Sequence, residues 1–411
     1  MQTHLAPFVQ DTAEGREAEA ILRRCVHCGF CTATCPTYQL LGDELDGPRG
    51  RIYLIKQVLE GKPATEKTRT HLDRCLTCRS CETTCPSGVQ YARLLDIGRE
   101  VVEKQVPRGA REQLVREGLR KGIANGSLFD LALKTAQMVA PLLPEVLRKR
   151  VPEVQPQTSW APLRHERRML VLDGCVQPSL APNINAAASR VLDAIGISLV
   201  RAPDAGCCGA VDFHMNAQTQ ARDRMRRLID VWWPHLEAGI DTIVFTASGC
   251  GVMLKDYAHV LAGDAAYRAK AERITAACRD LIEVLDDDRE RLLALPRTKN
   301  IAQKIAIHSP CTLQHGLRLA PRMESLLRDL GLRLSEVPDA HLCCGSAGTY
   351  SILQPELSGR LRANKIAALE SGRPTEIVTA NIGCLTHLRP SANVRVRHWI
   401  ELVADLIGAP H

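Results

Sequence analysis

Aromatic residues are scarce in this chain of 411 residues, which contains 5 Phe, 4 Trp and 6 Tyr. Proteins that bind single-stranded nucleic acid stack bases on aromatic side chains, so this composition argues against such a platform. Long hydrophobic runs are also lacking. The apolar stretch 131–147 is interrupted by Lys134, Pro141, Pro144 and Glu145, and it falls short of the roughly 20 apolar residues of a transmembrane helix. We therefore expect no nucleic-acid partner and no membrane-spanning segment.

The chain also lacks the motifs of nucleotide-binding and hydrolytic sites. No glycine-rich dinucleotide motif follows an expected strand, because Gly345-Ser-Ala-Gly348 lacks the third glycine and the setting. No phosphate-binding loop, nucleophile elbow or pair of catalytic carboxylates stands out. We expect no catalytic residue on this chain, so two-electron chemistry on a substrate would take place on a cofactor held by a partner.

The start of the chain lacks a basic stretch followed by an apolar one, the pattern of a secretory signal. The chain has 17 cysteines, an odd number, which favours a reducing compartment where thiols bind metals or perform redox chemistry. We expect a cytoplasmic protein. The formal net charge of +7 counts cysteine as neutral, and metal-bound thiolates would lower it, so the basic excess is a weak argument for a nucleic-acid partner.

Two copies of the pattern C-x2-C-x2-C-x3-C-P lie in the first hundred residues. This spacing is typical of [4Fe–4S] clusters in pairs, where the fourth cysteine of each motif ligates the other cluster. The expected ligands are Cys25, Cys28, Cys31 and Cys85 for cluster 1, and Cys75, Cys78, Cys81 and Cys35 for cluster 2. Structural zinc is the alternative, but such sites usually combine two Cys-x2–4-Cys pairs.

The two motifs lie 50 positions apart, and residues 51–60 between them read as a helix. This arrangement resembles the helical ferredoxin domain found in succinate dehydrogenase and heterodisulfide reductase, which implies an α-helical domain over residues 1–100. Gly29 allows the backbone to approach the first cluster closely, whereas Arg79 occupies the same position in the second motif.

Residues 101–165 are expected to form a helical, basic linker. Its segment 104–150 contains ten Lys or Arg and four Asp or Glu. Two interpretations remain open: a solvated helical face, or a docking surface for a partner or for anionic lipids.

The sequence then repeats itself, with each copy containing a Cys-Cys-Gly segment. Strands expected at 168–173 and 304–308 each end shortly before a cysteine, and Cys-Cys-Gly follows 32 positions after that cysteine. The cysteines are Cys175, Cys207, Cys208 and Cys250 in the first copy, and Cys311, Cys343, Cys344 and Cys384 in the second. This pattern predicts two tandem α/β domains, 166–300 and 301–411, with mostly parallel sheets and cysteines at the carboxyl ends of strands.

These copies resemble the cysteine-rich domain of heterodisulfide reductase, which supplies five cysteines per domain and ends in Cys-x2-Cys. This chain departs from that pattern, since Met253 and His387 stand where the fifth cysteine would be. Three interpretations remain open: a further iron–sulfur cluster or other metal, a dithiol redox site, or structural cysteines. A metal site is favoured in the second copy because His387 is available as a ligand. His308 and His315 are further candidate ligands there.

The overall plan resembles a family of iron–sulfur subunits that includes those of glycolate oxidase, lactate utilisation and anaerobic glycerol-3-phosphate dehydrogenase, and fused heterodisulfide-reductase-like proteins. Segments 41–56, 81–91, 309–316 and 384–387 are most similar to the glycolate oxidase group. The resemblance covers essentially the whole chain.

The resemblance implies an electron-transfer subunit of a glycolate oxidase (glycolate dehydrogenase) complex. Two FAD-binding-type partner subunits would oxidise glycolate to glyoxylate, and this chain would pass the electrons toward a membrane quinone. It would be a peripheral protein on the cytoplasmic face of the inner membrane. Subunits of lactate or glycerol-3-phosphate complexes are the alternatives, and a cluster-based redox sensor is the alternative outside the enzymes.

Overall fold

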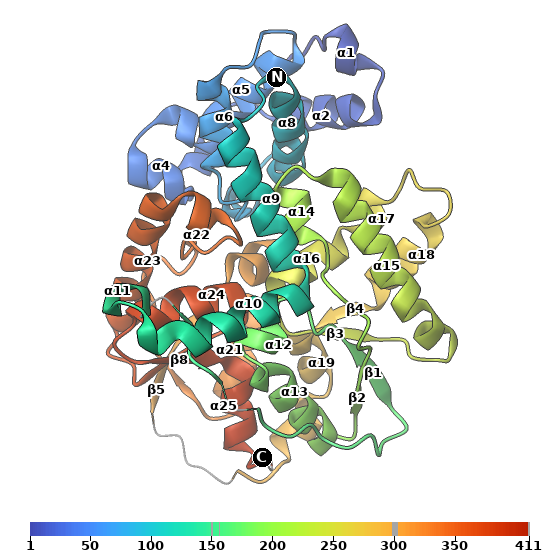
Figure 1. The fold of residues 1–411 in the computed structure, drawn as a ribbon, viewed down its shortest axis with the longest axis vertical. Helices are drawn as coiled ribbons and strands as arrows, with labels where there is room; N and C mark the ends of the chain where they lie inside the picture. Colours follow the sequence, from blue (N-terminus) through green and yellow to red (C-terminus); the bar gives the residue numbers. More distant parts are fainter. Residues whose placement is uncertain (149–150, 156, 298–302, 410–411) are drawn as a thin grey trace.

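Three domains follow one another along the chain, and the computed structural model describes residues 1–148, 151–155, 157–297 and 303–409 (Figure 1). A helical N-terminal domain packs against two α/β domains, and two linker helices lead from the N-terminal domain onto the α/β domains. The expected mixed fold class, with one helical and two α/β domains, is confirmed.

Short helices build the N-terminal domain, and no strand occurs among its described residues. They are α1 (Pro7–Gln10), α2 (Ala13–Arg24), α3 (Phe30–Ala33), α4 (Pro36–Leu41), the 3-10 turn η1 (Glu44–Asp46), α5 (Pro48–Leu59), α6 (Glu66–Asp73), α7 (Ser80–Thr84) and α8 (Tyr91–Gln105). Proline at the first position of α4 and α5 suits a helix start, because its missing N–H has no partner there in any case. Helices α2, α5 and α8 pack around buried Leu22, Ile55 and Leu95. The expected helix at 51–60 is α5, and α8 extends beyond the expected domain boundary at residue 100.

Helices occupy the first part of the segment expected as a helical linker, 101–165, and its described residues after Arg148 contain none. The linker comprises α9 (Ala110–Ala124), α10 (Gly126–Val139), the 3-10 turn η2 (Ala140–Leu142) and α11 (Glu145–Arg148). Many of its basic side chains form ion pairs: Arg108 and Arg116 with acidic groups of the N-terminal domain and α9, and Lys121 with Glu117. These basic side chains therefore pair with acidic groups of the protein itself. Lys149 and Arg150 lie outside the described residues.

Each α/β domain has a four-stranded sheet. The strands are β1 (Arg168–Val171), β2 (Ser198–Arg201), β3 (Ile243–Phe245) and β4 (Cys278–Asp280) in the first domain, and β5 (Lys304–His308), β6 (Arg333–Leu334), β7 (Glu376–Thr379) and β8 (Arg395–His398) in the second. The orders are β2-β1-β3-β4 and β6-β5-β7-β8, and every pairing is parallel. The two topologies are the same, which supports a tandem duplication.

Helices cover both faces of each sheet, so the central strands are largely buried, as in β5 with buried Ile305 and Ile307. In the first domain they are α12 (Gln177–Leu180), α13 (Asn183–Ala194), α14 (Ala210–His214), α15 (Gln218–Glu237), α16 (Ser248–Lys255), α17 (Tyr257–Val260), α18 (Arg268–Ala277), α19 (Leu281–Asp287) and α20 (Arg289–Leu293). In the second domain they are the π-helical turn η3 (Thr312–Gly316), α21 (Ala320–Asp329), α22 (Tyr350–Leu353), α23 (Pro355–Glu370), α24 (Ile382–Leu388), the 3-10 turn η4 (Arg389–Ser391) and α25 (Trp399–Leu406).

The two α/β domains share one hydrophobic core. Helix α13 of the first packs on α25 of the second, and buried residues of both sheets belong to the same apolar cluster. His398, at the end of β8, donates a hydrogen bond from Nε2 to the carbonyl of Thr246 (3.0 Å), at the end of β3. Burial lowers the pKa of His398 to about 3, so the ring is neutral. The carboxyl ends of the two sheets therefore meet at a fixed interface.

Candidate functional site

Two cavities in the N-terminal domain are each lined by cysteines of both sequence motifs. The motif cysteines of the first cavity include Cys25, Cys28, Cys31 and Cys85, and those of the second include Cys75, Cys78, Cys81 and Cys35. Each cavity thus combines three cysteines of one motif with the fourth of the other. Cys81 lines both cavities, so they share a wall.

The two motifs adopt the same backbone conformation around their cavities. His27 and Gly29 in the first motif have φ of +60° and +88°, and Thr77 and Arg79 in the second have φ of +54° and +61°. Left-handed residues between right-handed ones aim successive backbone N–H groups into a concavity that favours anions, such as the sulfides of a cluster. The N–H of Thr77 donates to Cys75 Sγ at 3.4 Å.

Gly29 and Arg79 meet the same backbone requirement differently. A Cβ on Gly29 would lie 2.7 Å from Arg49 Nη1, so glycine is suited to both the conformation and the space. Arg79 adopts a left-handed conformation that is unfavourable for a residue with a side chain, and its guanidinium is anchored to Asp256 of the first α/β domain at 2.7 Å.

The spacing of the thiols fits a cluster better than a single ion. A tetrahedral Zn²⁺ with Zn–S distances of about 2.3 Å holds its sulfurs roughly 3.8 Å apart. Within the described ranges, the groups that bring three ligand atoms within 4.8 Å of one another contain none of the eight motif cysteines. The motif thiols are therefore gathered less closely than the ligands of one ion, and an all-thiolate donor set suits iron–sulfur ligation.

Burial disfavours free thiolates in these cavities. It raises the pKa of Cys31 to about 11, together with the neighbouring thiol of Cys25. The pKa values of Cys78 and Cys81 are also well above the ordinary range, mainly because of burial. Thiols of this kind become ligands when a cation replaces their protons, so cofactor binding would release protons.

A buried ion network that sequence reasoning missed supports the second cavity. Asp46 is fully buried and interacts with Arg51 (3.4 Å), His71 (3.0 Å) and Arg74 (2.9 Å). Arg51 also lines the cavity and donates from Nε to the carbonyl of His71. Asp43, Asp46 and His71 place ligand atoms within 4.8 Å of one another, but the two arginines already neutralise Asp46. The signal in the sequence was the charged pair within the segment 41–56, whose partners only the fold reveals.

The two cavities differ in their exposure. Cys28 is exposed, and the neighbouring Val26 and Phe30 are exposed apolar residues at the rim of the first cavity. Next to the second cavity, Leu76 is buried with residues of the second α/β domain, including Tyr350, and Cys78 and Cys311 pack against this apolar cluster. The first cavity therefore faces the surface, and the second faces the second Cys-Cys-Gly segment.

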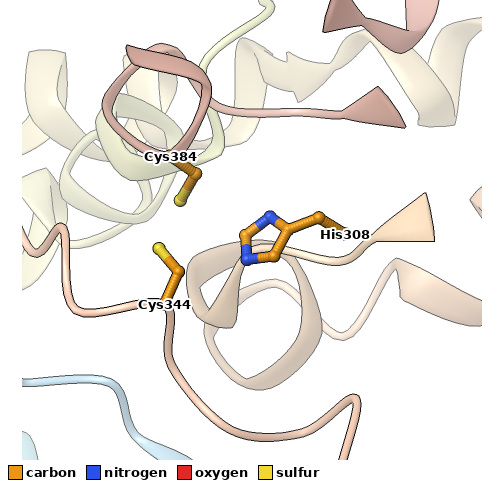
Figure 2. Close-up of side chains that lie close together, drawn as sticks. All are labelled: His308, Cys344 and Cys384. Atoms are coloured by element: carbon orange, nitrogen blue, oxygen red, sulfur yellow. The ribbon is translucent and has the colours of Figure 1, made fainter. Parts of the chain in front are cut away.

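In the second α/β domain, the structure gathers part of the proposed ligand set. His308, Cys344 and Cys384 are buried and place their ligand atoms within 4.8 Å of one another (Figure 2). Cys311 Sγ and Cys343 Sγ are 3.9 Å apart.

The other two candidate histidines make different contacts. His387 lies outside this group, and its Nε2 is 3.3 Å from Ser358 Oγ. The ring nitrogens of His315 contact the Thr83 hydroxyl (2.9 Å) and the carbonyl of His341 (3.0 Å). His315 therefore connects the N-terminal domain to the second α/β domain.

The first copy is organised differently. Within the described residues, Cys175, Cys207, Cys208 and Cys250 belong to no group of three ligand atoms within 4.8 Å. Both Cys-Cys-Gly glycines have φ near +88°, and a Cβ on Gly345 would lie 2.7 Å from the carbonyl oxygen of Ser358. This glycine is therefore required by backbone conformation and close packing, whether or not a metal binds nearby.

Comparison with protein-family models matches all three domains. A 4Fe-4S dicluster domain matches residues 21–89, and a cysteine-rich domain matches twice, at residues 169–255 and 305–389. The chain therefore carries an iron–sulfur domain followed by a repeated cysteine-rich domain.

Two curated relatives match nearly the whole chain, and others match about half of it. The glycolate oxidase iron–sulfur subunit of Escherichia coli K12 is 55% identical over 408 residues, 99% of each chain. The probable glycolate oxidase iron–sulfur subunit of Bacillus subtilis is 27% identical over 97% of each chain. Lactate utilization protein A of Bacillus velezensis is 25% identical over 236 residues, which are 56% of this chain and 95% of that protein. This chain belongs to the glycolate oxidase iron–sulfur subunit family.

Proposed function

We propose that this chain is the electron-transfer subunit of a complex that oxidises glycolate to glyoxylate. The observation that carries the proposal is the pair of cavities with crossed cysteine sets and a shared wall. It supports two [4Fe–4S] clusters, one held by Cys25, Cys28, Cys31 and Cys85 and the other by Cys75, Cys78, Cys81 and Cys35. Glycolate is favoured over lactate because the relatives named for glycolate oxidase match the whole chain, whereas the lactate utilization protein matches about half of it.

The electron balance of the reaction calls for partner subunits. Glycolate loses two electrons and two protons on its way to glyoxylate, and a flavin such as FAD on a partner is suited to accept both electrons. Clusters carry one electron at a time, so this chain would receive the electrons singly and deliver two of them, with two protons from solvent, to a quinone. The exposed Cys28 makes the first cavity the suitable point of contact with a redox partner.

Loss of one ligand from each cavity tests the proposal. In the anaerobically purified complex, Cys28→Ser and Cys78→Ser should each lower the iron content of this chain from about eight atoms to about four. Glycolate should still reduce the partner flavin, while quinone reduction is lost. Cys278→Ala is the matched control, because Cys278 is buried in β4 outside both cavities. Quinone reduction at the normal rate in either serine variant would remove the clusters from the electron path.

We also propose that the linker places the protein on the cytoplasmic face of the inner membrane. No helix in the described ranges is both long and apolar enough to cross a bilayer. Exposed apolar side chains recur every three, four or seven residues along α10 and η2. They are Leu128, Leu131, Met138 and Leu142. A helix with an exposed apolar face suits the surface of a bilayer, and the basic residue of α10, Lys134, is paired with Asp130 on the same helix.

Binding to vesicles of phosphatidylglycerol and phosphatidylethanolamine tests this position. The double variant Leu131→Glu, Met138→Glu should reduce binding at least tenfold, because each carboxylate would have to enter the apolar region of the bilayer. Val154→Glu, Leu163→Glu changes two exposed apolar residues outside α10 and should bind like the unmodified complex. Equal binding of all three would exclude α10 as the contact.

A further inference from the structure

The two cysteine-rich domains have the same topology but differ at one buried position. His308 lies three residues before Cys311 at the end of β5, and the residue three positions before Cys175 is Leu172. Both side chains are 3% exposed. A similar difference follows the third strand, where Asn381 precedes Cys384 by three residues and Ala247 precedes Cys250 by three. The second domain thus has polar groups where the first is apolar.

The two polar groups of the second domain are directed at its cysteines. The ring of His308 faces the sulfurs of Cys344 and Cys384 (Figure 2), and the amide of Asn381 donates from Nδ2 to Cys384 Sγ at 3.4 Å. Three parts of the fold contribute: the end of β5, the Cys-Cys-Gly loop and the start of α24. The shared topology of the two copies does not require these groups, since the first domain forms the same sheet without them.

The hydrogen bonding of His308 suits metal binding. Its Nδ1 lies 2.9 Å from the Thr379 hydroxyl, and when Nδ1 donates its proton there, the lone pair of Nε2 is free for a metal ion. A hydrogen bond to the second ring nitrogen is a regular feature of histidine ligands, because it fixes both tautomer and orientation.

We propose that His308, Cys344 and Cys384 bind a single thiophilic divalent ion, Zn²⁺ or Fe²⁺, and that the corresponding site of the first domain does not. The ligand atoms of this trio lie within 4.8 Å of one another, the spacing of a mononuclear site, unlike the motif cysteines of the N-terminal domain. One imidazole and two thiolates form a donor set that both ions accept.

The proposed ion would lie near the second cavity without being part of it. Cys343 is the chain neighbour of Cys344, Cys311 lies 3.9 Å from Cys343, and Cys311 packs with Cys78 against the same apolar cluster. An ion bound to the trio would hold together the loop and helix of the second domain that border this cluster. The inference does not depend on the proposed electron-transfer role, since it concerns residues outside both cavities.

Metal analysis of the purified full-length chain, equilibrated with Zn²⁺ and freed of excess by gel filtration, tests the proposal. The unmodified chain should retain about one zinc per chain besides the cluster iron, and X-ray absorption at the zinc edge should show nitrogen at about 2.0–2.1 Å and sulfur at about 2.3 Å. A chain prepared without added zinc should instead hold about one iron atom that is not accompanied by sulfide.

Variants distinguish this site from the other cysteines. His308→Leu, which introduces the residue of the first domain, and Cys384→Ser should each lose the zinc and keep the cluster iron. Cys250→Ser, the counterpart of Cys384→Ser in the first domain, should keep both. Thr379→Val retains all three ligands and should weaken zinc binding about 10–100-fold, because it removes the hydrogen bond that orients His308.

Four results would overturn the proposal. They are an unmodified chain that retains no zinc and no iron beyond the clusters, equal loss of zinc in Cys250→Ser, zinc retention in both His308→Leu and Cys384→Ser, and additional iron with matching sulfide, which would indicate a cluster in place of a single ion. Because cluster iron is measured in the same samples, misfolding of a variant is detected, and failure of the electron-transfer proposal remains a separate result.

Discussion

A single buried carboxylate organises the protein side of the second cavity. Asp46 has no exposed surface and interacts with two arginines and a histidine, so its negative charge is compensated within the protein. Removing one partner of such a network leaves other buried charges without compensation, which costs more than the network itself contributes. Glu44, two residues earlier, forms an ion pair with Arg49 whose side chains are much more exposed to solvent than Asp46.

These neighbouring residues give a matched prediction. Asp46→Asn should lower the free energy of unfolding by about 3 kcal/mol, because Arg51 and Arg74 lose their buried counter-charge. Glu44→Gln should lower it by less than about 1 kcal/mol, as for exposed ion pairs in general. Anaerobic denaturant unfolding of the two variants measures the difference. Similar losses in both would show that Asp46 is not the centre of the network.

Sequence reasoning extends to single residues where spacing in the chain determines which residues are neighbours. The cysteine motifs are such a case, because three ligands lie within seven residues and the fourth follows from the crossed pattern. It did not identify Asp46, whose partners come from α5 and α6, and it ranked His387 above His308 as a ligand. Which histidine faces a thiol depends on side-chain direction at the end of a strand and of a helix, and spacing does not determine that direction.

The junction of β4 and α19 shows how a helix cap can carry a pH dependence. Asp280 caps α19 by accepting a hydrogen bond from the N–H of Ile282 at 2.9 Å, and Glu283 accepts one from the N–H of Asp280. The side chain is completely buried, and burial raises the pKa of Asp280 to about 7. The folded protein therefore binds a proton here more tightly than the unfolded chain does.

The sign of the effect follows from proton linkage. A carboxyl whose pKa is higher in the folded state loses stability as pH rises from its unfolded pKa, near 4, through about 7. Asp280→Asn keeps the cap and has no charge, so its melting temperature relative to the unmodified chain should be higher at pH 8 than at pH 6. Asp280→Ala removes the cap and should lose about 1 kcal/mol even at pH 6. A pH-independent difference for the asparagine variant would contradict the raised pKa.

Elements were predictable where a periodic apolar pattern coincided with a repeat. The strands expected at 168–173 and 304–308 are β1 and β5, and the parallel sheets follow from alternation of strands and helices. The contact of α13 with α25 was not predictable, because it joins elements more than 200 residues apart through surfaces whose composition resembles that of any buried helix.

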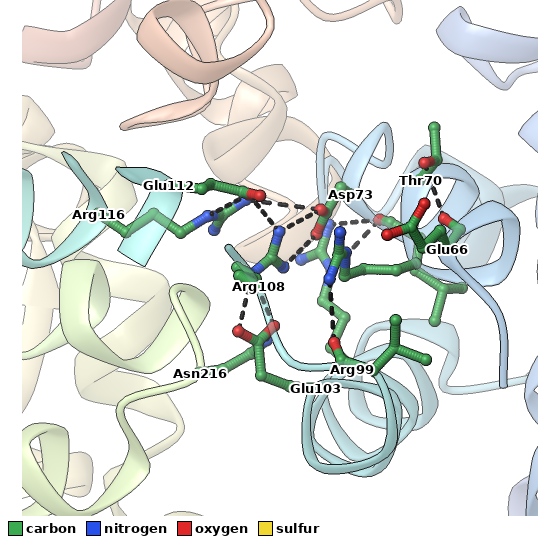
Figure 3. A network of polar contacts seen from close by, with 12 residues as sticks. Glu66, Thr70, Asp73, Arg99, Glu103, Arg108, Glu112, Arg116 and Asn216 are labelled. Carbon is green, nitrogen blue, oxygen red and sulfur yellow. Dashed lines mark hydrogen bonds and ion pairs between the residues drawn. The ribbon is translucent and has the colours of Figure 1, made fainter. Parts of the chain in front are cut away.

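At the scale of the whole molecule, one arginine connects the N-terminal domain with the linker helix α9 and, through Glu103, with the first α/β domain. Arg108 has a side chain 2% exposed and contacts Asp73, Glu103 and Glu112 (Figure 3). Glu103 in turn accepts a hydrogen bond from Asn216 of the first α/β domain at 3.2 Å. Burial would raise the pKa of Asp73, but hydrogen bonds and charge from Arg108, with Arg116, lower it below the ordinary value.

Removing this arginine should weaken the coupling between domains. Arg108→Met should destabilise the protein by about 2 kcal/mol, because Glu103 loses its ion pair and Asp73 and Glu112 keep only Arg116. Calorimetry should then show the N-terminal domain melting before the rest. Lys121→Met, which removes an exposed pair with Glu117 on α9, should leave the melting profile unchanged. A single unbroken transition at the original temperature in the Arg108 variant would exclude this role.

The second cavity, lined by Cys35, Cys75, Cys78 and Cys81, lies next to the second α/β domain. This position has a consequence for biosynthesis. The ribosome completes Cys85 well before it reaches Tyr350 and the residues that pack beside this cavity. At about 5–20 residues per second, that interval lasts roughly 13–53 s. During this time the second cavity would be open to a cofactor-delivery protein. Cys28 keeps the first cavity accessible afterwards as well. A cofactor of the second cavity would therefore be installed most easily on the nascent chain, before the second α/β domain packs beside it.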